Sequence, residues 1–265
     1  MRWDIEELDG VAIVRMLSSR GNKQNPEFFA DLNDAFDRLD RDHPRAAIVL
    51  TGTGSIFSVG IDFEYSFALF QARQLDAIRA WFREFRGAML RVFRTLRPTV
   101  AAVNGHAFAG GAILALGCDF RVAQTGDFRC GINEVPVGIP MPSVYTELIR
   151  HRLGTPRTTE AILTGRTYSP EQALAAGIYQ EVVEPEQLIP AAVEWARCVA
   201  PAAMPAYEHS KRMLLAPVLE RMTSLSDALD NETTAEVIAS EPLLEVQKQS
   251  LALLRQRKGA AAGRG

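Results

Sequence analysis

The sequence predicts an α/β core followed by a helical C-terminal section. Apolar runs at residues 46–50, 99–103 and 119–123 alternate with segments whose apolar residues recur at helical spacing. Glycine-bearing turns follow the first two runs, and from Ser143 onward the pattern is almost wholly helical. Strands that alternate with helices at this spacing favour a sheet fed by crossover helices.

The N-terminal part predicts a hairpin and then a helix. Two short β-like runs within residues 3–17 flank Asp9-Gly10, a dipeptide typical of hairpin turns. Pro26 is expected to begin a helix. Its apolar positions recur at helical spacing, at Phe28, Phe29, Leu32, Ala35, Phe36 and Leu39. Residues 63–96 are expected to be mostly helical, and residues 112–116 to form a short helix.

Three parts of the chain are expected to differ in role. Residues 1–200 are expected to form the core, residues 201–258 a helical oligomerisation section, and residues 259–265 a small-residue, disordered tail. The helices within residues 205–257 either pack on another subunit or cap the core of their own chain. Both alternatives fit the amphipathic pattern.

Bulk properties exclude several classes of partner. The 265 residues carry a net charge of −3 from interspersed charges, so the sequence shows no footprint for nucleic acid or an anionic membrane surface. No apolar window is long enough to span a bilayer, and residues 1–7 resemble neither a signal nor a transit peptide. Cys118, Cys130 and Cys198 form no C-x-x-C pair, which indicates free, buried thiols and a cytoplasmic location.

Several familiar sites are absent from the sequence. The chain has no G-x-G-x-x-G turn for a dinucleotide, no Gly-Lys-Ser/Thr after its glycine-rich loop for a phosphate, and no G-x-S-x-G for a nucleophilic serine. Its histidines lack ligand spacing, so no metal site is expected. His106 is expected to have a structural role.

Two glycine turns are candidates for stabilising a negatively charged oxygen. The segments 58–62 and 109–111 each follow an apolar strand and precede a helical segment. Backbone N–H groups from two such turns can converge on one oxygen and form an oxyanion hole. The alternative is that these glycines only permit tight turns.

Glu134 is the candidate acid or base. It lies in the otherwise apolar, loop-rich segment 130–140. A carboxylate that loses its hydration among apolar residues has a raised pKa and can act as a base near neutral pH. The alternative is an ordinary solvated loop glutamate.

The ordered set of these motifs resembles the crotonase (enoyl-CoA hydratase/isomerase) superfamily. The segments that carry the resemblance are 57–62, 103–111, 118–121 and 131–134, extended by 163–166 and 173–178, and it covers roughly residues 5–215. The resemblance implies a ββα spiral core and a helical C-terminal part that builds trimers, or dimers of trimers, around acyl-coenzyme A sites. It implies no cofactor besides the coenzyme A of the substrate.

The resemblance also implies roles for individual residues. The N–H groups of Ile61 and Gly110 would hold the thioester oxygen, and Glu134 would be the acid/base group. Hydratases of the family carry a second glutamate at the position of Ile113, where an aliphatic side chain cannot position water. The pattern is therefore closest to the one-glutamate Δ3-Δ2-enoyl-CoA isomerases of fatty acid metabolism. A hydratase or lyase with an unrecognised second group, and a non-catalytic acyl-CoA-binding protein, remain alternatives.

Further substrate contacts are expected around these groups. Arg20 and Lys23 are candidates for the coenzyme A phosphates. Aromatic residues between Phe63 and Phe85 either line an acyl tunnel or pack in the core. The remaining candidate contacts of the substrate are Asp62, Phe63, Gly111, Ile113, Asn133 and Pro140.

Overall fold

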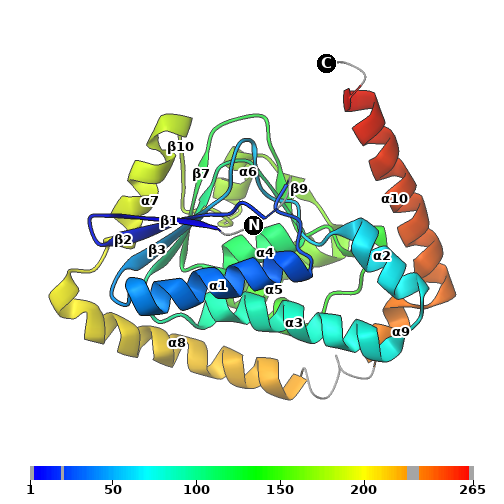
Figure 1. The fold of residues 1–265 in the computed structure, drawn as a ribbon, viewed down its shortest axis with the longest axis horizontal. Coiled ribbons are helices and arrows are strands. Elements are labelled where there is room, and N and C mark those ends of the chain that lie inside the picture. The colour runs from blue at the N-terminus through cyan, green and yellow to red at the C-terminus, as the bar shows by residue number, and fades with distance from the viewer. Residues whose placement is uncertain (1–2, 19–20, 226–232, 263–265) are drawn as a thin grey trace.

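The computed structural model describes residues 3–18, 21–225 and 233–262, which form two sheets and surrounding helices (Figure 1). The six-stranded main sheet has the order β1-β2-β3-β5-β7-β10, with strands Asp4–Leu8, Val11–Arg15, Ala47–Thr51, Thr99–Val103, Phe120–Gln124 and Glu181–Val183. The four-stranded sheet has the order β4-β6-β8-β9, with strands Ile56–Ser58, His106–Phe108, Cys130–Gly131 and Thr167–Tyr168. The helices are α1 Pro26–Asp42, α2 Phe63–Gln71, α3 Leu75–Arg94, α4 Gly110–Gly117, α5 Ser143–Thr164, α6 Pro170–Ala175, α7 Leu188–Ala196, α8 Met204–Leu225, α9 Ala235–Ile238 and α10 Glu241–Ala262, with short 3-10 helices η1 Val135–Val137, η2 Pro185–Gln187 and η3 Pro201–Ala203.

The predicted hairpin and first helix are confirmed. Strands β1 and β2 pair antiparallel around Asp9 and Gly10, whose φ values of 52° and 77° suit a tight hairpin turn. Asn25 caps α1, because its side chain accepts a hydrogen bond from the backbone N–H of Phe28 at 3.0 Å. The buried residues of α1 are the six apolar positions that the spacing selects.

Both faces of the main sheet are covered by helices, because successive residues of its strands point to opposite faces and are buried on each. Strands β2, β3, β5, β7 and β10 run parallel to one another, and β1 is antiparallel, at the edge beside β2. Val11 and Ile13 of β2 pack in a cluster with α7, whereas Ala12 and Val14 belong to the larger cluster that includes α1 and α3. In Figure 1 α7 and α1 accordingly lie on different sides of the strands.

The smaller sheet and two late strands were not predicted. Strands β4, β6, β8 and β9 have two or three residues each, too few for a period-two pattern to be visible. Strand β10 adds to the edge of the main sheet beside β7. The expectation that the chain is almost wholly helical after Ser143 is therefore corrected at residues 167–168 and 181–183.

The C-terminal helices extend away from the sheets. Helix α8 packs on α5, and α10 stands beside α2 at one end of the molecule (Figure 1). Helix α10 continues to Ala262, so residues 259–262 do not form the expected irregular tail, and residues 263–265 lie outside the described residues. No helix among the described residues is long and apolar enough to cross a membrane.

The three cysteines are free, but only two of them are buried. Cys118 and Cys130 lie in the core, whereas Cys198 is exposed after α7, which corrects the expectation for that residue. Cys198 follows an apolar helix, and the sequence gives no sign that the helix ends with this side chain facing outward.

Candidate active site

The first glycine turn is held by a neighbouring loop. The backbone N–H of Gln24 donates to the carbonyl of Gly60 at 2.8 Å, and the N–H of Asp62 donates to the carbonyl of Gln24 at 2.9 Å. The N–H of Val59 also donates to the carbonyl of Gly21 at 3.0 Å. In this parallel bridge the backbone groups of residues 60 and 62 face Gln24, so the N–H of Ile61 points the other way.

The second turn places a helix N-terminus beside the first. Ala109 precedes α4 with φ 51° and ψ −125°, an uncommon backbone conformation for a residue with a side chain. Gly110 is the first residue of α4, where backbone N–H groups have no intrahelical acceptor. A side chain on Gly111 would meet the carbonyl oxygen of Ser58 at 2.1 Å, so this glycine allows α4 to lie against β4. Gly111 therefore serves the packing of the two turns, and its contact with a substrate stays a prediction.

The two turns meet beyond the carboxyl ends of neighbouring strands. Strands β3 and β5 are parallel partners, and the chain leaves each of them toward one of the turns. A Cβ atom on Gly60, whose φ is 80°, would lie 2.7 Å from the carbonyl oxygen of Phe108 and 2.8 Å from the backbone nitrogen of Gly110. Only glycine permits this approach, which places Gly60, the residue before Ile61, against the backbone nitrogen of Gly110.

Asn104 supports the entry to the first turn, a role that its sequence position did not suggest. Its side-chain oxygen accepts a hydrogen bond from the N–H of Gly52 at 2.9 Å, and its side-chain nitrogen donates to the carbonyl of Gly54 at 2.9 Å. The side chain thereby links the end of β5 to the loop after β3. The signal in the sequence was a polar residue directly after an apolar strand, but nothing there named its partners.

Glu134 is tied to the second turn through the smaller sheet. Strand β8 pairs with β6, and the N–H of Ala109 donates to the carbonyl of Gly131 at 2.8 Å. Glu134 follows three residues later, at the N-cap position directly before η1. Its backbone carbonyl accepts hydrogen bonds from the N–H groups of Val137 and Ile139. These contacts hold the backbone of Glu134 rigidly next to the strand that leads to Gly110.

The side chain of Glu134 is buried and unsatisfied. It is 6% exposed, and its Oε2 atom has no hydrogen-bond partner. Burial disfavours the charged carboxylate and raises the pKa of Glu134 to about 8. The alternative of a solvated loop glutamate is therefore wrong, and the side chain is suited to exchange protons near neutral pH.

The other glutamate buried in the described part of the chain has a structural environment. Glu147 of α5 is paired with Arg150 and, at 3.0 Å, with Arg221 of α8. Its two carboxylate oxygens are thus each used by an arginine side chain. Glu134 is thus the buried carboxyl group in these residues whose partner is missing.

The remaining residues predicted to contact the substrate differ in burial and in their polar partners. Ile113 is 1% exposed and belongs to the main hydrophobic cluster. Asp62 caps α2, with its Oδ1 3.6 Å from Nζ of Lys23, so both side chains lie beside the first turn. Asn133 is half-buried with an unpartnered Oδ1. Phe63 and Pro140 are also half-buried, and Arg20 lies outside the described residues.

Part of the predicted aromatic segment forms a continuous cluster. Phe70, Trp81 and Phe85 are buried, with ring centroids 5.6 Å apart for Phe70 and Trp81 and 5.7 Å for Trp81 and Phe85. Phe85 reaches the second turn, because its Cζ atom is 3.2 Å from the position of a Cβ on Gly110. Tyr65 is 43% exposed and does not belong to this cluster.

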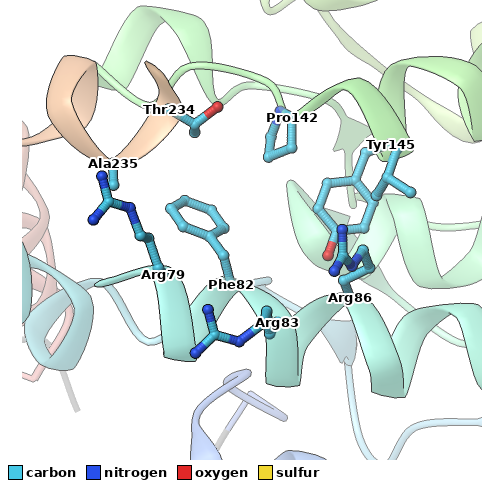
Figure 2. Close-up of a pocket in the computed structure, with 9 residues that line it drawn as sticks. Arg79, Phe82, Arg83, Arg86, Pro142, Tyr145, Thr234 and Ala235 are labelled. Carbon is cyan, nitrogen blue, oxygen red and sulfur yellow. The ribbon is translucent and has the colours of Figure 1, made fainter. Parts of the chain in front are cut away.

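A small pocket lies next to the aromatic cluster, between α3, the beginning of α5 and α9 (Figure 2). Its wall includes Tyr145, whose ring centroid is 5.0 Å from that of Phe85. Figure 2 shows Phe82 at its centre, with arginine side chains of α3 around it. The labelled lining residues are Arg79, Phe82, Arg83, Arg86, Pro142, Tyr145, Thr234 and Ala235.

His106 has a structural environment, as expected. Its Nδ1 atom accepts a hydrogen bond from the backbone N–H of Arg129 at 3.1 Å, and its ring stacks on Phe108 at 5.5 Å. It therefore links β6 to the segment before β8. No group of three or more metal-ligating side chains gathers within the described residues.

Relatives of known sequence carry names from both branches of one enzyme family. The chain is 35% identical over 199 residues to a putative enoyl-CoA hydratase of Thermus thermophilus, which covers 74% of this chain and 77% of the relative. It is 25% identical over 258 residues to human mitochondrial enoyl-CoA delta isomerase 1, covering 94% of this chain and 82% of the relative. These names support the family and leave the choice between the two reactions open.

Solved structures and the family match agree with these relatives. The structure of human mitochondrial delta3-delta2-enoyl-CoA isomerase is similar in fold, with a TM-score of 0.87 and 24% identity over 97% of this chain and 100% of that one. An enoyl-CoA hydratase/isomerase from Xanthobacter autotrophicus Py2 gives a TM-score of 0.80 at 25% identity, covering 100% and 97%. The family described as "Enoyl-CoA hydratase/isomerase" matches residues 6–245. The predicted fold is thus confirmed, and this chain belongs to the enoyl-CoA hydratase/isomerase family, the crotonase superfamily.

Proposed function

We propose that this enzyme moves the carbon–carbon double bond of an enoyl-CoA from the 3,4 to the 2,3 position. The observation that carries the proposal is the buried, unpartnered carboxyl group of Glu134 with Ile113 where a hydratase needs its second glutamate. One carboxylate can remove a proton from C2 and return it to C4, whereas the addition of water needs a further group that orients the water. No cofactor is needed beyond the coenzyme A that the substrate carries.

The proposed mechanism divides the work between the amides and the carboxylate. The N–H groups of Ile61 and Gly110 donate to the thioester oxygen and stabilise the negative charge that develops there when the C2 proton leaves. The Glu134 carboxylate takes that proton and becomes a carboxylic acid. This acid then returns the proton to C4 of the dienolate. The raised pKa of Glu134 favours the first step, because it makes the carboxylate a stronger base. The acid so formed can still protonate C4, because the dienolate is a far stronger base than the carboxylate.

The experiment that tests the reaction follows one absorbance with two substrates. With 3-hexenoyl-CoA, an isomerase increases the absorbance of the conjugated thioester as 2-hexenoyl-CoA forms. With 2-hexenoyl-CoA, a hydratase decreases that absorbance as the double bond is consumed. A decrease in absorbance with 2-hexenoyl-CoA, without an increase with 3-hexenoyl-CoA, would replace our proposal by the hydratase alternative. Binding of both thioesters without either absorbance change would indicate a non-catalytic protein.

The rate of isomerisation is expected to depend on the ionisation of Glu134. Because the base must be deprotonated and its pKa is about 8, kcat/KM should rise about tenfold per pH unit below that value and level off above it. Initial rates from pH 5.5 to 9.5 at low 3-hexenoyl-CoA concentration give kcat/KM at each pH and measure this rise. A flat profile over that range would remove Glu134 as the base of the free enzyme.

We also propose that the chain forms trimers or dimers of trimers in the cytoplasm. Exposed apolar side chains on the two longest C-terminal helices support an interface there: Met213, Leu214, Leu253 and Leu254. Their exposure also speaks against a role limited to capping their own chain. Sedimentation velocity should give a species of three or six 29.2 kDa chains, and a stable monomer would contradict the proposal.

A further inference from the structure

Gln24 carries a polar side chain that the fold itself does not use. Its backbone N–H and carbonyl hold residues 60 and 62, but its side chain is 0% exposed, and neither Oε1 nor Nε2 has a hydrogen-bond partner. An unsatisfied buried amide is costly, and an apolar side chain of similar size would avoid that cost. The side chain therefore points to a partner that the protein alone does not supply.

The position of this amide is beside the proposed thioester site. A Cβ on Gly110 would lie 2.0 Å from Oε1 and 3.0 Å from Cδ of Gln24. The Gln24 amide thus lies over the Cα atom of the residue whose N–H we assign to the thioester oxygen. A ligand atom that Gln24 contacts must be within a few bonds of the thioester carbonyl.

The aromatic residues around Gln24 are buried and apolar, which suits the acyl part of the ligand better than its coenzyme A arm. The Phe85 ring approaches the same side of Gly110, at 3.2 Å from the position of a Cβ. Phe85 is 4% exposed and stacks on both Phe29 and Trp81. The coenzyme A arm must lead out to solvent, so a part of the ligand that reaches this enclosed aromatic region belongs to the acyl side of the thioester.

A second unsatisfied polar group belongs to the same cluster. The Nε1 atom of Trp81 is buried and has no hydrogen-bond partner, and its ring centroid is 5.7 Å from that of Phe85. An indole N–H can only donate, and an amide can donate and accept. A purely aliphatic acyl chain leaves both groups unsatisfied, whereas an oxygen atom on the chain can pair with them.

Resting on the proposed function, we infer that Gln24 selects an acyl-CoA thioester whose acyl chain bears a hydroxyl or oxo oxygen on C5 or C6, just beyond the 3,4 double bond. The Gln24 amide donates to this oxygen, and also accepts from it where it is a hydroxyl. Gln24 is in this role a specificity-determining residue, because it makes no contact with the atoms that exchange protons. Discrimination against the plain chain follows, since that chain buries the amide without a partner.

The test compares binding of unreactive thioesters by calorimetry. The ligands are hexanoyl-CoA and its 5-hydroxy, 5-oxo and 6-hydroxy derivatives, each titrated into the wild-type protein and into Gln24→Leu. We expect at least one oxygenated ligand to bind the wild type about tenfold more tightly than hexanoyl-CoA. Gln24→Leu should abolish this preference while hexanoyl-CoA binds as well as before or more tightly.

Matched variants and outcomes keep the inference falsifiable. Gln71→Leu, at an exposed position of α2, should keep the preference, and Gln24→Met should lose it as Gln24→Leu does. Equal weakening of all four ligands by Gln24→Leu would overturn the inference and assign the amide to the coenzyme A arm. A wild-type protein that binds all four ligands equally well would also overturn the inference and would make water the partner of the Gln24 amide.

The two proposals fail separately in this design. A wild type that prefers an oxygenated ligand but does not isomerise 3-hexenoyl-CoA or an oxygenated 3-enoyl-CoA contradicts the isomerase and leaves the selection by Gln24 standing. Isomerisation without a preference contradicts the selection alone. Failure to bind any of the four thioesters contradicts both.

Discussion

Glu134→Gln should lower kcat for isomerisation of 3-hexenoyl-CoA by about 10²–10⁴-fold, because one general acid/base group contributes that much to a rate. The loss is expected at the upper end, since the same carboxyl group both removes and returns the proton. Glutamine has nearly the same shape, so the Kd of hexanoyl-CoA should change little. Stopped-flow or steady-state absorbance measures the rate, and calorimetry measures the Kd.

Controls separate this effect from damage to the fold. Glu186→Gln, at an exposed position of η2, changes a glutamate in the same way and should keep the full rate. A Glu134→Gln enzyme with more than about a tenth of the wild-type kcat would exclude Glu134 as the acid/base group and assign the proton transfer to another group.

The same substitution should make the protein more stable at alkaline pH. The folded pKa of about 8 lies above the unfolded value of 4.5, so the folded wild type holds a proton that the unfolded chain has lost between these values. Wild-type stability relative to Glu134→Gln is therefore greatest below pH 4.5 and falls by about 1.4 kcal/mol per pH unit until about pH 8. Urea unfolding of both proteins at pH 5, 7 and 9 measures the difference, and parallel pH dependence would contradict the raised pKa.

Gly60→Ala should lower kcat by about 10²–10³-fold, the usual cost of losing one oxyanion donor. The new methyl group would lie 2.8 Å from the backbone nitrogen of Gly110 and 2.7 Å from the carbonyl of Phe108. Because both neighbours are backbone atoms, the two turns must separate, and one oxygen can no longer contact both amides. The effect should appear in kcat with 3-hexenoyl-CoA at saturating concentration.

Gly54→Ala is the matched control for Gly60→Ala. Gly54 also has a positive φ, of 61°, but a Cβ there meets nothing within 4 Å. Both variants share the backbone strain of alanine in a left-handed conformation, about 1 kcal/mol, so both should unfold at lower urea concentration. Only Gly60→Ala should lose activity. Comparable rates in the two variants would contradict the convergence of the two turns on one oxygen.

The sequence determined the parts of this protein that depend on local pattern. The Asp9-Gly10 turn between β-like runs predicted the hairpin, and continuous apolar runs predicted the central strands. Helical apolar spacing predicted α1, and its six buried positions follow from a period of 3.6 residues. Glycines after two strands marked both turns, and the ordered motifs indicated the family that the comparisons confirm. These features could be predicted because each lies within one continuous segment.

Burial and long-range contact were decided only by the tertiary structure. The sequence left Glu134 open between a solvated loop and a buried site, and did not distinguish Gln24 from its polar neighbours in Asn22-Lys23-Gln24-Asn25. Strands β9 and β10 and the exposure of Cys198 were likewise missed, since strand pairing and solvent contact depend on residues far away in the chain. The raised pKa of Glu134 and the approach of Gly60 to Gly110 have the same origin, because desolvation and close contact arise only when separate segments pack together.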